Sequence, residues 1–217
     1  MADPRGAFIV LEGLDGAGTT TLSRRLADVL RVEGRRVLLT HEPSDGPVGL
    51  LIRQVLRHRF VCPGGEPPGW QTMALLFAAD RHDHLQSEIR PALARGEVVI
   101  SDRYDASTMA YQTATSPDPR TGPWIQAVHG FALRPDLVIV LDVPAETGER
   151  RRTARGDAPE VFERLEVQRK VAEVYRHLED HFPRDRIVHV DGTLDASAVA
   201  CAALGPVREL LAGAGRP

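Results

Sequence analysis

Near the N-terminus an apolar run passes directly into a glycine-rich turn and then into a helical pattern. Phe8–Leu11 has the Val/Ile/Leu character of a strand buried on both faces, and apolar residues take helical spacing from about Thr19. Gly13, Gly18 and Thr20 match the pattern G-x-x-x-x-G-K-[ST], but Thr19 stands where the pattern has lysine. The stretch therefore predicts an α/β fold with a phosphate-binding loop that lacks its usual lysine.

The physical chemistry of such a loop lies mostly in its backbone. Glycines let the main chain approach a ligand closely, and the N–H groups and dipole at a helix N-terminus favour an anion. A hydroxyl at Thr20 can join the Mg²⁺ shell of a bound nucleotide, whereas Thr19 cannot supply the charge that bridges the β- and γ-phosphates. The residues expected to hold ATP are Gly13, Leu14, Asp15, Gly16, Ala17, Gly18, Thr19 and Thr20.

Four further apolar segments alternate with helical patterns along the chain. The predicted strands are Val37–Thr40, Val98–Ser101, Leu137–Leu141 and Ile187–Val190, and the first helix is expected over Thr19–Glu33. Short Val/Ile/Leu-rich strands joined by helices predict a three-layer α/β/α sandwich with a five-stranded parallel sheet. The 217 residues are expected to form a single domain, 1–217, because the Pro/Gly-rich loops are too short to be linkers.

A later pattern predicts one long amphipathic helix. Its apolar positions are Val161, Phe162, Leu165, Val171, Val174, Tyr175 and Leu178. The Pro/Gly-rich segments Cys62–Gly69 and Thr115–Pro123 are expected to be loops.

Charge and composition exclude some classes of protein. A net charge of −3 argues against a general nucleic-acid or membrane-surface binder, and runs such as Leu137–Leu141 are too short to cross a bilayer. No signal-peptide pattern precedes Phe8, so we expect a cytoplasmic protein. Cys62 and Cys201 lack metal-ligand spacing and are expected to be free thiols. Because Lys170 is the only lysine among 27 basic residues, any cation that replaces the loop lysine must be an arginine.

Residues that directly follow the strands are candidates for the site, because ligands of open α/β sheets bind at the carboxyl ends of the strands. They include Glu42 after the second strand, Asp102 and Arg103 after the third, and Asp142 after the fourth. Asp102 resembles the strand-ending carboxylate beside Mg²⁺ in loop nucleotide-binding proteins, and a helix cap is the alternative.

Several separated segments, taken in order, resemble thymidylate kinase. They are Glu12–Gly18, Glu42-Pro43 with Ile52-Arg53, Leu75–Arg81, Ile89–Gly96, Ser101–Gln112, and Arg134–Leu137 leading into Leu141-Asp142. With the lid and the helix after it, the resemblance covers about Phe8 to Leu178. It implies a P-loop nucleoside monophosphate kinase fold and a homodimer, as in the family.

The resemblance also implies roles for the matched residues. Phe77 would stack on thymine, with Arg81 donating to a base carbonyl and Thr108 and Gln112 nearby. Tyr111 would lie beneath the deoxyribose, and Asp15 would hold the 3′-hydroxyl. Arg53 and Arg103 would bind the 5′-phosphate of the acceptor, and Glu12 and Asp102 would orient Mg²⁺ and its waters. Core packing for Phe77, ion pairing for Arg53 and Arg103, and turn formation for Asp15 are the alternatives.

The lid departs from the family pattern. Arg150–Gly156 resembles an arginine-bearing lid, placed at about 150–160, but Asp157–Glu163 lacks the usual Asp-Arg-x-Glu run. The resemblance implies that Arg151, Arg152 or Arg155 closes over the phosphates, although a solvated basic helix end is the alternative. Such arginines are worth about 10³ to 10⁵ in rate, so one of them would offset Thr19 in part, and we expect a slower enzyme than a lysine-bearing relative.

The function implied is transfer of the γ-phosphoryl group of Mg·ATP to dTMP, giving dTDP and ADP for dTTP biosynthesis. Two alternatives stay open. The first is a regulatory protein that binds nucleotide but has lost catalysis with the lysine, and the second is a kinase for another deoxynucleoside monophosphate.

Overall fold

A five-stranded parallel sheet forms the centre of the protein. The computed structural model describes residues 6–156, 162 and 164–213. The strands are β1 (Phe8–Gly13), β2 (Val37–His41), β3 (Val98–Asp102), β4 (Leu137–Asp142) and β5 (Ile187–Asp191). Their order is β2-β3-β1-β4-β5, with every neighbouring pair parallel. Every residue of β1 is buried, as expected for a central strand covered on both faces.

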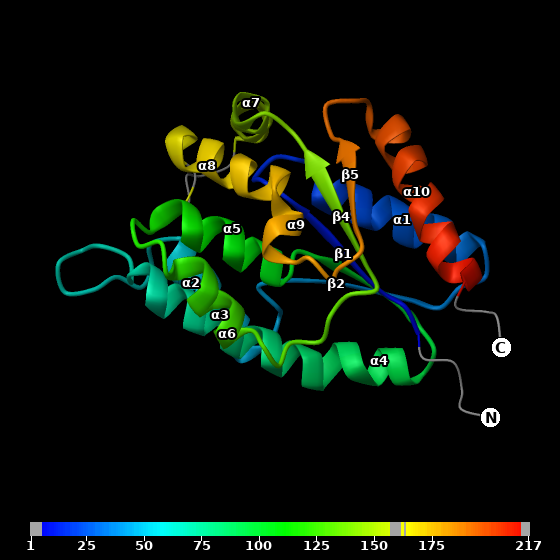
Figure 1. Cartoon of the computed structure of the whole chain (residues 1–217), viewed down its shortest axis with the longest axis horizontal. Helices are drawn as coiled ribbons and strands as arrows, with labels where there is room; N and C mark the ends of the chain where they lie inside the picture. The colour runs from blue at the N-terminus through cyan, green and yellow to red at the C-terminus, as the bar shows by residue number, and fades with distance from the viewer. Residues whose placement is uncertain (1–5, 157–161, 163, 214–217) are drawn as a thin grey trace.

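Helices cover both faces of this sheet. They are α1 (Thr19–Val32), α2 (Pro47–Leu56), α3 (Trp70–His84), α4 (Arg90–Ala94), α5 (Asp105–Thr115), α6 (Thr121–Val128), α7 (Ala145–Arg155), α8 (Leu165–Arg176), α9 (Leu178–His181) and α10 (Ala196–Gly213). A π-helical segment, Leu85–Ile89, joins α3 to α4. Helices α1 and α10 lie on one face, and α4, α5 and α8 lie on the other, which completes the expected three-layer α/β/α sandwich (Figure 1).

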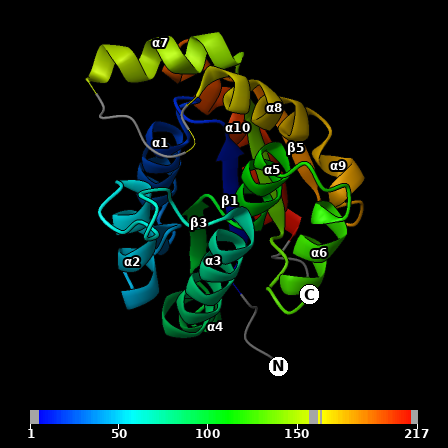
Figure 2. The same ribbon diagram turned by 90° about the vertical axis from the view of Figure 1, so that its left-hand side faces the viewer.

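The strand register brings the candidate residues to one edge of the sheet. Leu11 pairs with Asp102 and Gly13 with Leu141, so the glycine-rich loop after β1 begins beside the ends of β3 and β4. Helix α7 lies across this carboxyl edge in Figure 2. The order of strands reverses here, with β3 on one side of β1 and β4 on the other, and ligands of doubly wound sheets bind at such a point.

Most predicted elements are confirmed, with shifts at their ends. The strands run one or two residues further than expected, and α1 ends at Val32. The loop expected over Thr115–Pro123 is wrong at both ends, because α5 ends at Thr115 and α6 begins at Thr121.

The long amphipathic pattern predicts one helix, but the segment forms two. Phe162 lies in a turn before α8, where its ring packs edge-on against Tyr111, and α8 ends at Arg176, so Leu178 begins the separate short helix α9. Val161 is outside the described residues. The apolar pattern continues through these breaks because Phe162 and Leu178 both pack into the core, although neither belongs to α8.

Helix α10 is long and apolar on average although it contains no long apolar run. In the described part of the chain one helix, α10, has the length and apolar composition to span a membrane, with a mean hydropathy of 1.2 over 18 residues. Alanines and scattered aliphatic residues give this mean without a continuous apolar run. The helix packs one face against α1, β4 and β5, burying Val199, Ala203 and Val207, and 28% of its residues are buried.

Candidate active site

The glycine-rich loop lies between the end of β1 and helix α7, and its backbone packs directly against α7. Gly16 has φ +87°, and a Cβ there would lie 2.4 Å from the carbonyl oxygen of Gly148 on α7. A Cβ on Gly148 would in turn lie 2.6 Å from the carbonyl oxygen of Asp15. Two glycines therefore let α7 rest directly on the loop, and no larger residue fits either position without moving the backbone.

Arginines of α7 reinforce this contact. Arg151 donates to the carbonyl oxygens of Ala17 (3.1 Å) and Gly192 (2.9 Å), and Arg152, which is buried, donates to that of Asp15 (2.6 Å). Arg151 and Arg155 line a hollow of about 390 Å³ together with the loop glycines and the start of α10. Of the lid expected at about 150–160, residues 150–155 form the second half of α7, and 157–160 lie outside the described residues.

A hydroxyl and a carboxylate meet at the start of α1. Thr20 Oγ1 donates to Asp102 Oδ2 at 2.5 Å, and the other carboxylate oxygen, Oδ1, is buried without a hydrogen-bond partner. Both line a hollow of about 470 Å³ that also reaches Arg103. Thr19, by contrast, is only 6% exposed, and its methyl group packs toward Gly13. Hard oxygen donors with an unsatisfied carboxylate oxygen suit Mg²⁺.

No cage of protein ligands accompanies this pair. Among the described residues, His, Cys, Asp and Glu side chains nowhere gather in threes that could hold a metal ion. A divalent cation at Thr20 and Asp102 would therefore take most of its ligands from water and phosphate oxygens, as Mg²⁺ usually does in nucleotide sites.

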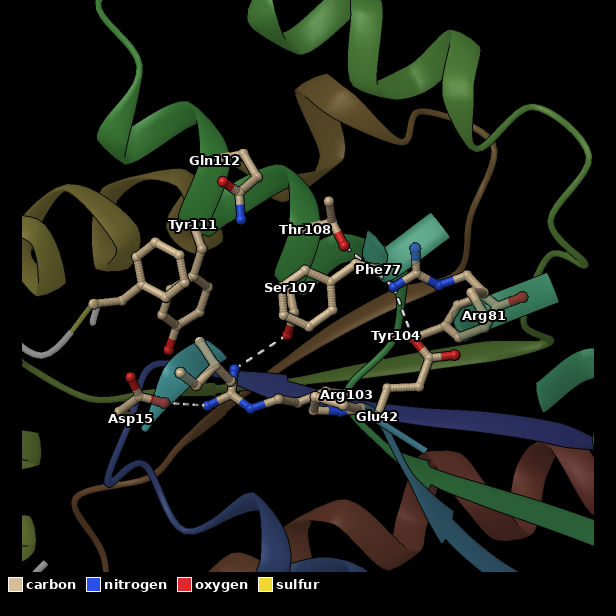
Figure 3. A pocket seen from close by; sticks show the side chains of 13 residues that line it. Asp15, Glu42, Phe77, Arg81, Arg103, Tyr104, Ser107, Thr108, Tyr111 and Gln112 are labelled. Atoms are coloured by element: carbon tan, nitrogen blue, oxygen red, sulfur yellow. Dashed lines mark hydrogen bonds and ion pairs between the residues drawn. The ribbon is translucent and has the colours of Figure 1, made fainter. Parts of the chain in front are cut away.

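A cavity of about 140 Å³ opens beside the loop (Figure 3). It brings together residues from α2, α3 and α5, from the segments that follow β1, β2 and β3, and from the turn before α8. Its lining residues are Asp15, Glu42, Pro43, Leu56, Phe77, Arg81, Arg103, Tyr104, Ser107, Thr108, Tyr111, Gln112 and Phe162.

Arg103 occupies the end of this cavity nearest the loop. Its guanidinium donates to Asp15 Oδ1 (2.7 Å), the carbonyl oxygen of Gly13 (3.1 Å) and Ser107 Oγ (3.1 Å), and it lies 5.3 Å above the Tyr111 ring centroid. The residue itself has φ +74°, a left-handed backbone that is uncommon for arginine. A fixed cation is thus presented between the loop and the cavity.

Arg81 occupies the other end and is almost fully buried. Its Nη2 donates to Glu42 Oε2 (2.7 Å) and Thr108 Oγ1 (3.2 Å), and its Nη1 donates to His129 Nδ1 (2.8 Å). Burial first, and the Arg81 charge second, lower the pKa of His129 to about 2, so the imidazole is neutral and accepts this bond. Both terminal nitrogens are occupied, which leaves Nε as the donor without a partner.

Other buried polar atoms around the cavity also lack partners. They are the hydroxyl groups of Tyr104 and Tyr111 and both amide atoms of Gln112. Buried polar groups are nearly always paired, and these unpaired atoms all belong to residues that line the cavity, which indicates a polar ligand there. With Arg81 Nε and the aromatic ring of Phe77, they suit a planar ring that carries carbonyl oxygens and an N–H group.

Glu12 is placed differently from the expectation of a metal-orienting residue. Its carboxylate accepts four hydrogen bonds, from Tyr104 N, Ser107 N, Ser107 Oγ and Tyr175 OH, all on the side of α5 and α8. Burial raises the pKa of Glu12 to about 7, even though the Ser107 and Tyr175 hydroxyls and the charge of Arg103 lower it. Each oxygen of this carboxylate thus accepts two hydrogen bonds from residues of α5, α8 or the N-cap of α5.

Arg53 lies just outside the cavity. Its guanidinium donates to the carbonyl oxygen of Pro43 (2.7 Å), a cavity residue, and to Asp45 (3.1 Å). The remaining expected acceptor-site residues, Phe77, Thr108, Tyr111 and Gln112, are brought together in the lining.

Several residues of the site were not assigned a role from the sequence. Gln168 on α8 is fully buried, donates to Asp15 Oδ2 (2.9 Å) and accepts from Asp15 N (3.2 Å). A signal existed, because Gln168 falls on the apolar face of the predicted helix, three residues from Leu165 and from Val171. Ser107 and Tyr104 lie within a segment already singled out, but His129 had no such signal.

Comparison with known proteins identifies the relatives of this chain. The family model described as thymidylate kinase matches residues 11–200. The chain belongs to the thymidylate kinase family. A probable thymidylate kinase of Pyrococcus horikoshii is 44% identical over 191 residues, covering 88% of this chain and 91% of the relative. A thymidylate kinase of Xanthomonas oryzae pv. oryzae is 38% identical over 219 residues, covering 99% and 90%.

Family membership accounts for the fold as well as the cavity. The all-parallel sheet with order β2-β3-β1-β4-β5 is typical of P-loop nucleoside monophosphate kinases, so the expected fold class is confirmed. The two hollows and the cavity meet at one loop, as a thymidylate kinase with two nucleotide substrates requires.

Proposed function

We propose that this chain works as a thymidylate kinase through the site described above. The activity of the family, phosphorylation of dTMP to dTDP with ATP, is the activity of the chain. An oxygen of the dTMP 5′-phosphate attacks Pγ, the bond from Pγ to the β–γ bridging oxygen breaks, and ADP leaves. That phosphate is largely deprotonated near pH 7, so no general base is needed, and catalysis consists of positioning and charge neutralisation.

The observation that carries the substrate assignment is Arg81, a residue of the cavity lining whose Nε is buried without a hydrogen-bond partner. A donor there pairs with a base carbonyl, such as the 4-carbonyl of thymine, and rejects the 4-amino group of cytosine because arginine cannot accept. Gln112 and Thr108 complete the polar contacts, and Phe77 stacks on the ring. Tyr111 lies beneath the deoxyribose, and Asp15 holds the 3′-hydroxyl.

The acceptor phosphate is assigned to Arg103, with Arg53 in support. Arg103 already spans the loop and the cavity, which is where the 5′-phosphate must meet the γ-phosphate. A guanidinium fork suits phosphate oxygens. Arg53 donates to the carbonyl oxygen of Pro43, a residue of the cavity lining, which places its guanidinium close to the cavity.

The donor nucleotide is assigned to the loop backbone, Gly13 to Thr20, and Mg²⁺ to Thr20 and Asp102. Their oxygen donors and the unpaired Asp102 Oδ1 support this assignment. When bound, Mg²⁺ would neutralise charge on the β- and γ-phosphate oxygens. Glu12 is left out of this set because its carboxylate is used elsewhere.

The charge missing at Thr19 is assigned to the arginines of α7. Arg151 and Arg155 line the hollow beside the loop glycines, whereas Arg152 is buried against Asp15 and secures the loop. An arginine of α7 must be ordered over the phosphates before it acts, which costs side-chain entropy, so the enzyme is expected to be slower than a lysine-bearing relative.

A nucleotide-binding regulatory protein is the rival function, and it rests on Thr19. The complete acceptor cavity argues against it, because a protein that has lost catalysis does not need unpaired donors that fit a nucleobase.

One assay separates these functions. ADP release is measured with dTMP, dUMP, dCMP and ribothymidine monophosphate, using the wild type, Thr19→Lys, Arg155→Ala, and Arg150→Ala as the matched control on α7. We expect dTMP to be the best acceptor, Thr19→Lys to be faster, and Arg155→Ala to lose far more rate than Arg150→Ala. Nucleotide binding without turnover, not rescued by Thr19→Lys, supports the regulatory function. Faster turnover with dCMP refutes the substrate assignment.

We also propose a single domain with its lid at about 150–160, a cytoplasmic location without nucleic-acid or membrane partners, and a homodimer. For the dimer, α2 and α3 expose Leu50, Leu51 and Leu75, and the segment between them exposes Phe60. Large apolar side chains gathered on two packed helices suit a second copy of the chain.

A further inference from the structure

Helix α5 forms one wall of the acceptor cavity, yet it begins without a cap of its own. Thr108, Tyr111 and Gln112 on this helix line the cavity, while Tyr104, its N-cap residue, makes no side-chain hydrogen bond to the first turn. The N–H groups of a first helical turn have no partner within the helix and need an acceptor from elsewhere.

Glu12 supplies that acceptor from a different part of the chain. Its Oε1 accepts from Tyr104 N at 2.9 Å and from Ser107 N at 3.2 Å, across 92 and 95 residues of sequence. A carboxylate in this place also interacts favourably with the dipole of α5. The arrangement is that of an N-cap, except that the capping residue comes from strand β1.

The second carboxylate oxygen extends the connection to α8. Oε2 accepts from Ser107 Oγ at 2.6 Å and from Tyr175 OH at 2.8 Å, and the Glu12 side chain is fully buried. Glu12 directly precedes the phosphate loop, which starts at Gly13. One side chain therefore joins the loop, the acceptor wall and the helix that carries Gln168.

Arg103 directly precedes Tyr104, whose N–H donates to Glu12, so the Glu12 contacts also hold the backbone at Arg103. Its left-handed backbone, φ +74°, persists only where neighbouring contacts hold it. Its own N–H donates to the carbonyl oxygen of Leu11 at 2.8 Å, and the N–H of the next residue, Tyr104, donates to Glu12. Two successive residues of β1 thus hold the two peptide N–H groups on either side of the Arg103 Cα.

We propose that Glu12 is a positioning residue of the acceptor site, whose buried carboxylate caps α5 and holds Arg103 and the cavity wall in register with the phosphate loop. The kinetic consequence rests on the proposed function, whereas the capping does not. The role requires the shape of the side chain and its acceptor atoms, and it does not require coordination of a cation.

Two substitutions separate shape from charge. Glu12→Gln keeps the length: its amide oxygen accepts from Tyr104 N and Ser107 N, and its amide nitrogen donates to the Ser107 and Tyr175 hydroxyls, which can each accept. Glu12→Asp keeps the charge but is one methylene shorter, so it leaves these N–H groups unpaired. Asp136→Asn is the matched control, because Asp136 Oδ2 accepts from Phe8 N (2.7 Å) at the opposite end of β1.

The measurements are KM for dTMP and for ATP, the Mg²⁺ dependence of turnover, and amide hydrogen exchange over 103–112. We expect Glu12→Asp to raise KM for dTMP about tenfold, the effect of unpairing buried N–H groups, and to speed exchange at 104–107. KM for ATP should change less than twofold. Glu12→Gln should stay close to the wild type in every measurement.

Other results overturn the proposal. The first is a lower KM for dTMP in Glu12→Asp than in Glu12→Gln. The second is a shifted Mg²⁺ dependence of turnover in Glu12→Gln. The third is an equal change of KM for dTMP and for ATP in Glu12→Asp that matches the change in Asp136→Asn. A wild type without dTMP turnover refutes the proposed function instead, and the exchange of the α5 amides still tests the capping.

Discussion

The buried pair of Arg81 and Glu42 gives the sharpest test of how the acceptor site is built. The two side chains are 1% and 2% exposed and are joined by a 2.7 Å charge-assisted hydrogen bond. Arg81→Met removes the cation but keeps most of the side-chain volume, and Glu42→Gln removes the opposite charge. The double variant removes both charges.

The expected magnitude follows from burial. Removing one partner of a buried ion pair leaves the other charge uncompensated, which costs about 3–5 kcal/mol. Glu42 keeps a second contact when Arg81 is removed, because His84 Nδ1 lies 3.4 Å from Glu42 Oε1, so the lower part of this range is expected. With an m-value of about 2 kcal/mol/M, 3 kcal/mol lowers the urea midpoint by about 1.5 M. The double variant should recover about 2 kcal/mol, since no charge is left unpaired.

Urea unfolding of the wild type, both single variants and the double variant gives the coupling energy, and the ADP-release assay is run on the same proteins. Arg81→Met and the double variant should both lose dTMP turnover, because both lack the Nε donor, although their stabilities differ. The reasoning is refuted by an Arg81→Met variant within 1 kcal/mol of the wild type. A double variant that is no more stable than Arg81→Met, or that phosphorylates dTMP normally, refutes it equally.

Three further predictions concern the loop, pH and assembly. Gly16→Ala should weaken ATP binding at least tenfold by calorimetry, because its Cβ would meet α7, whereas Gly205→Ala, with open space around it, should not. The hydrogen bond to Asp142 raises the pKa of His189, so its stabilising contribution is full below pH 6.5 and is lost as pH rises through the raised pKa. Wild type and His189→Asn should therefore differ more in unfolding free energy at pH 5.5 than at pH 9, and an equal difference contradicts this. Leu75→Glu should convert the proposed dimer to a monomer in light scattering, and an unchanged mass contradicts the proposed interface.

Much of the fold could be predicted because its signals are local. Strand β1 shows a continuous apolar run, the turn at Gly16 and Gly18 shows glycine where φ is positive, and α1 shows apolar residues at helical spacing. Element ends and the break between α8 and α9 could not be predicted, because packing inward from a turn and from a helix leaves the same apolar pattern.

The site divides in the same way. Residues such as Phe77, Arg81 and Arg103 were found through ordered motifs, and their gathering around one cavity follows from the strand order. The hydrogen-bond partners of these residues were not found from the sequence. Arg81 and His129, for example, are 48 residues apart and belong to no common motif.

Glu12 shows the difference between what the sequence determined and what the tertiary structure determined. The sequence by itself determined a parallel sheet and a glycine-rich loop without the usual lysine, since each depends on neighbouring residues along the chain, and the order of its motifs gave the residues that we propose for the acceptor site. Only the tertiary structure decided which way the Glu12 carboxylate turns. Its four donors come from residues 92 to 163 positions away, and their positions depend on how α5 and α8 pack against β1.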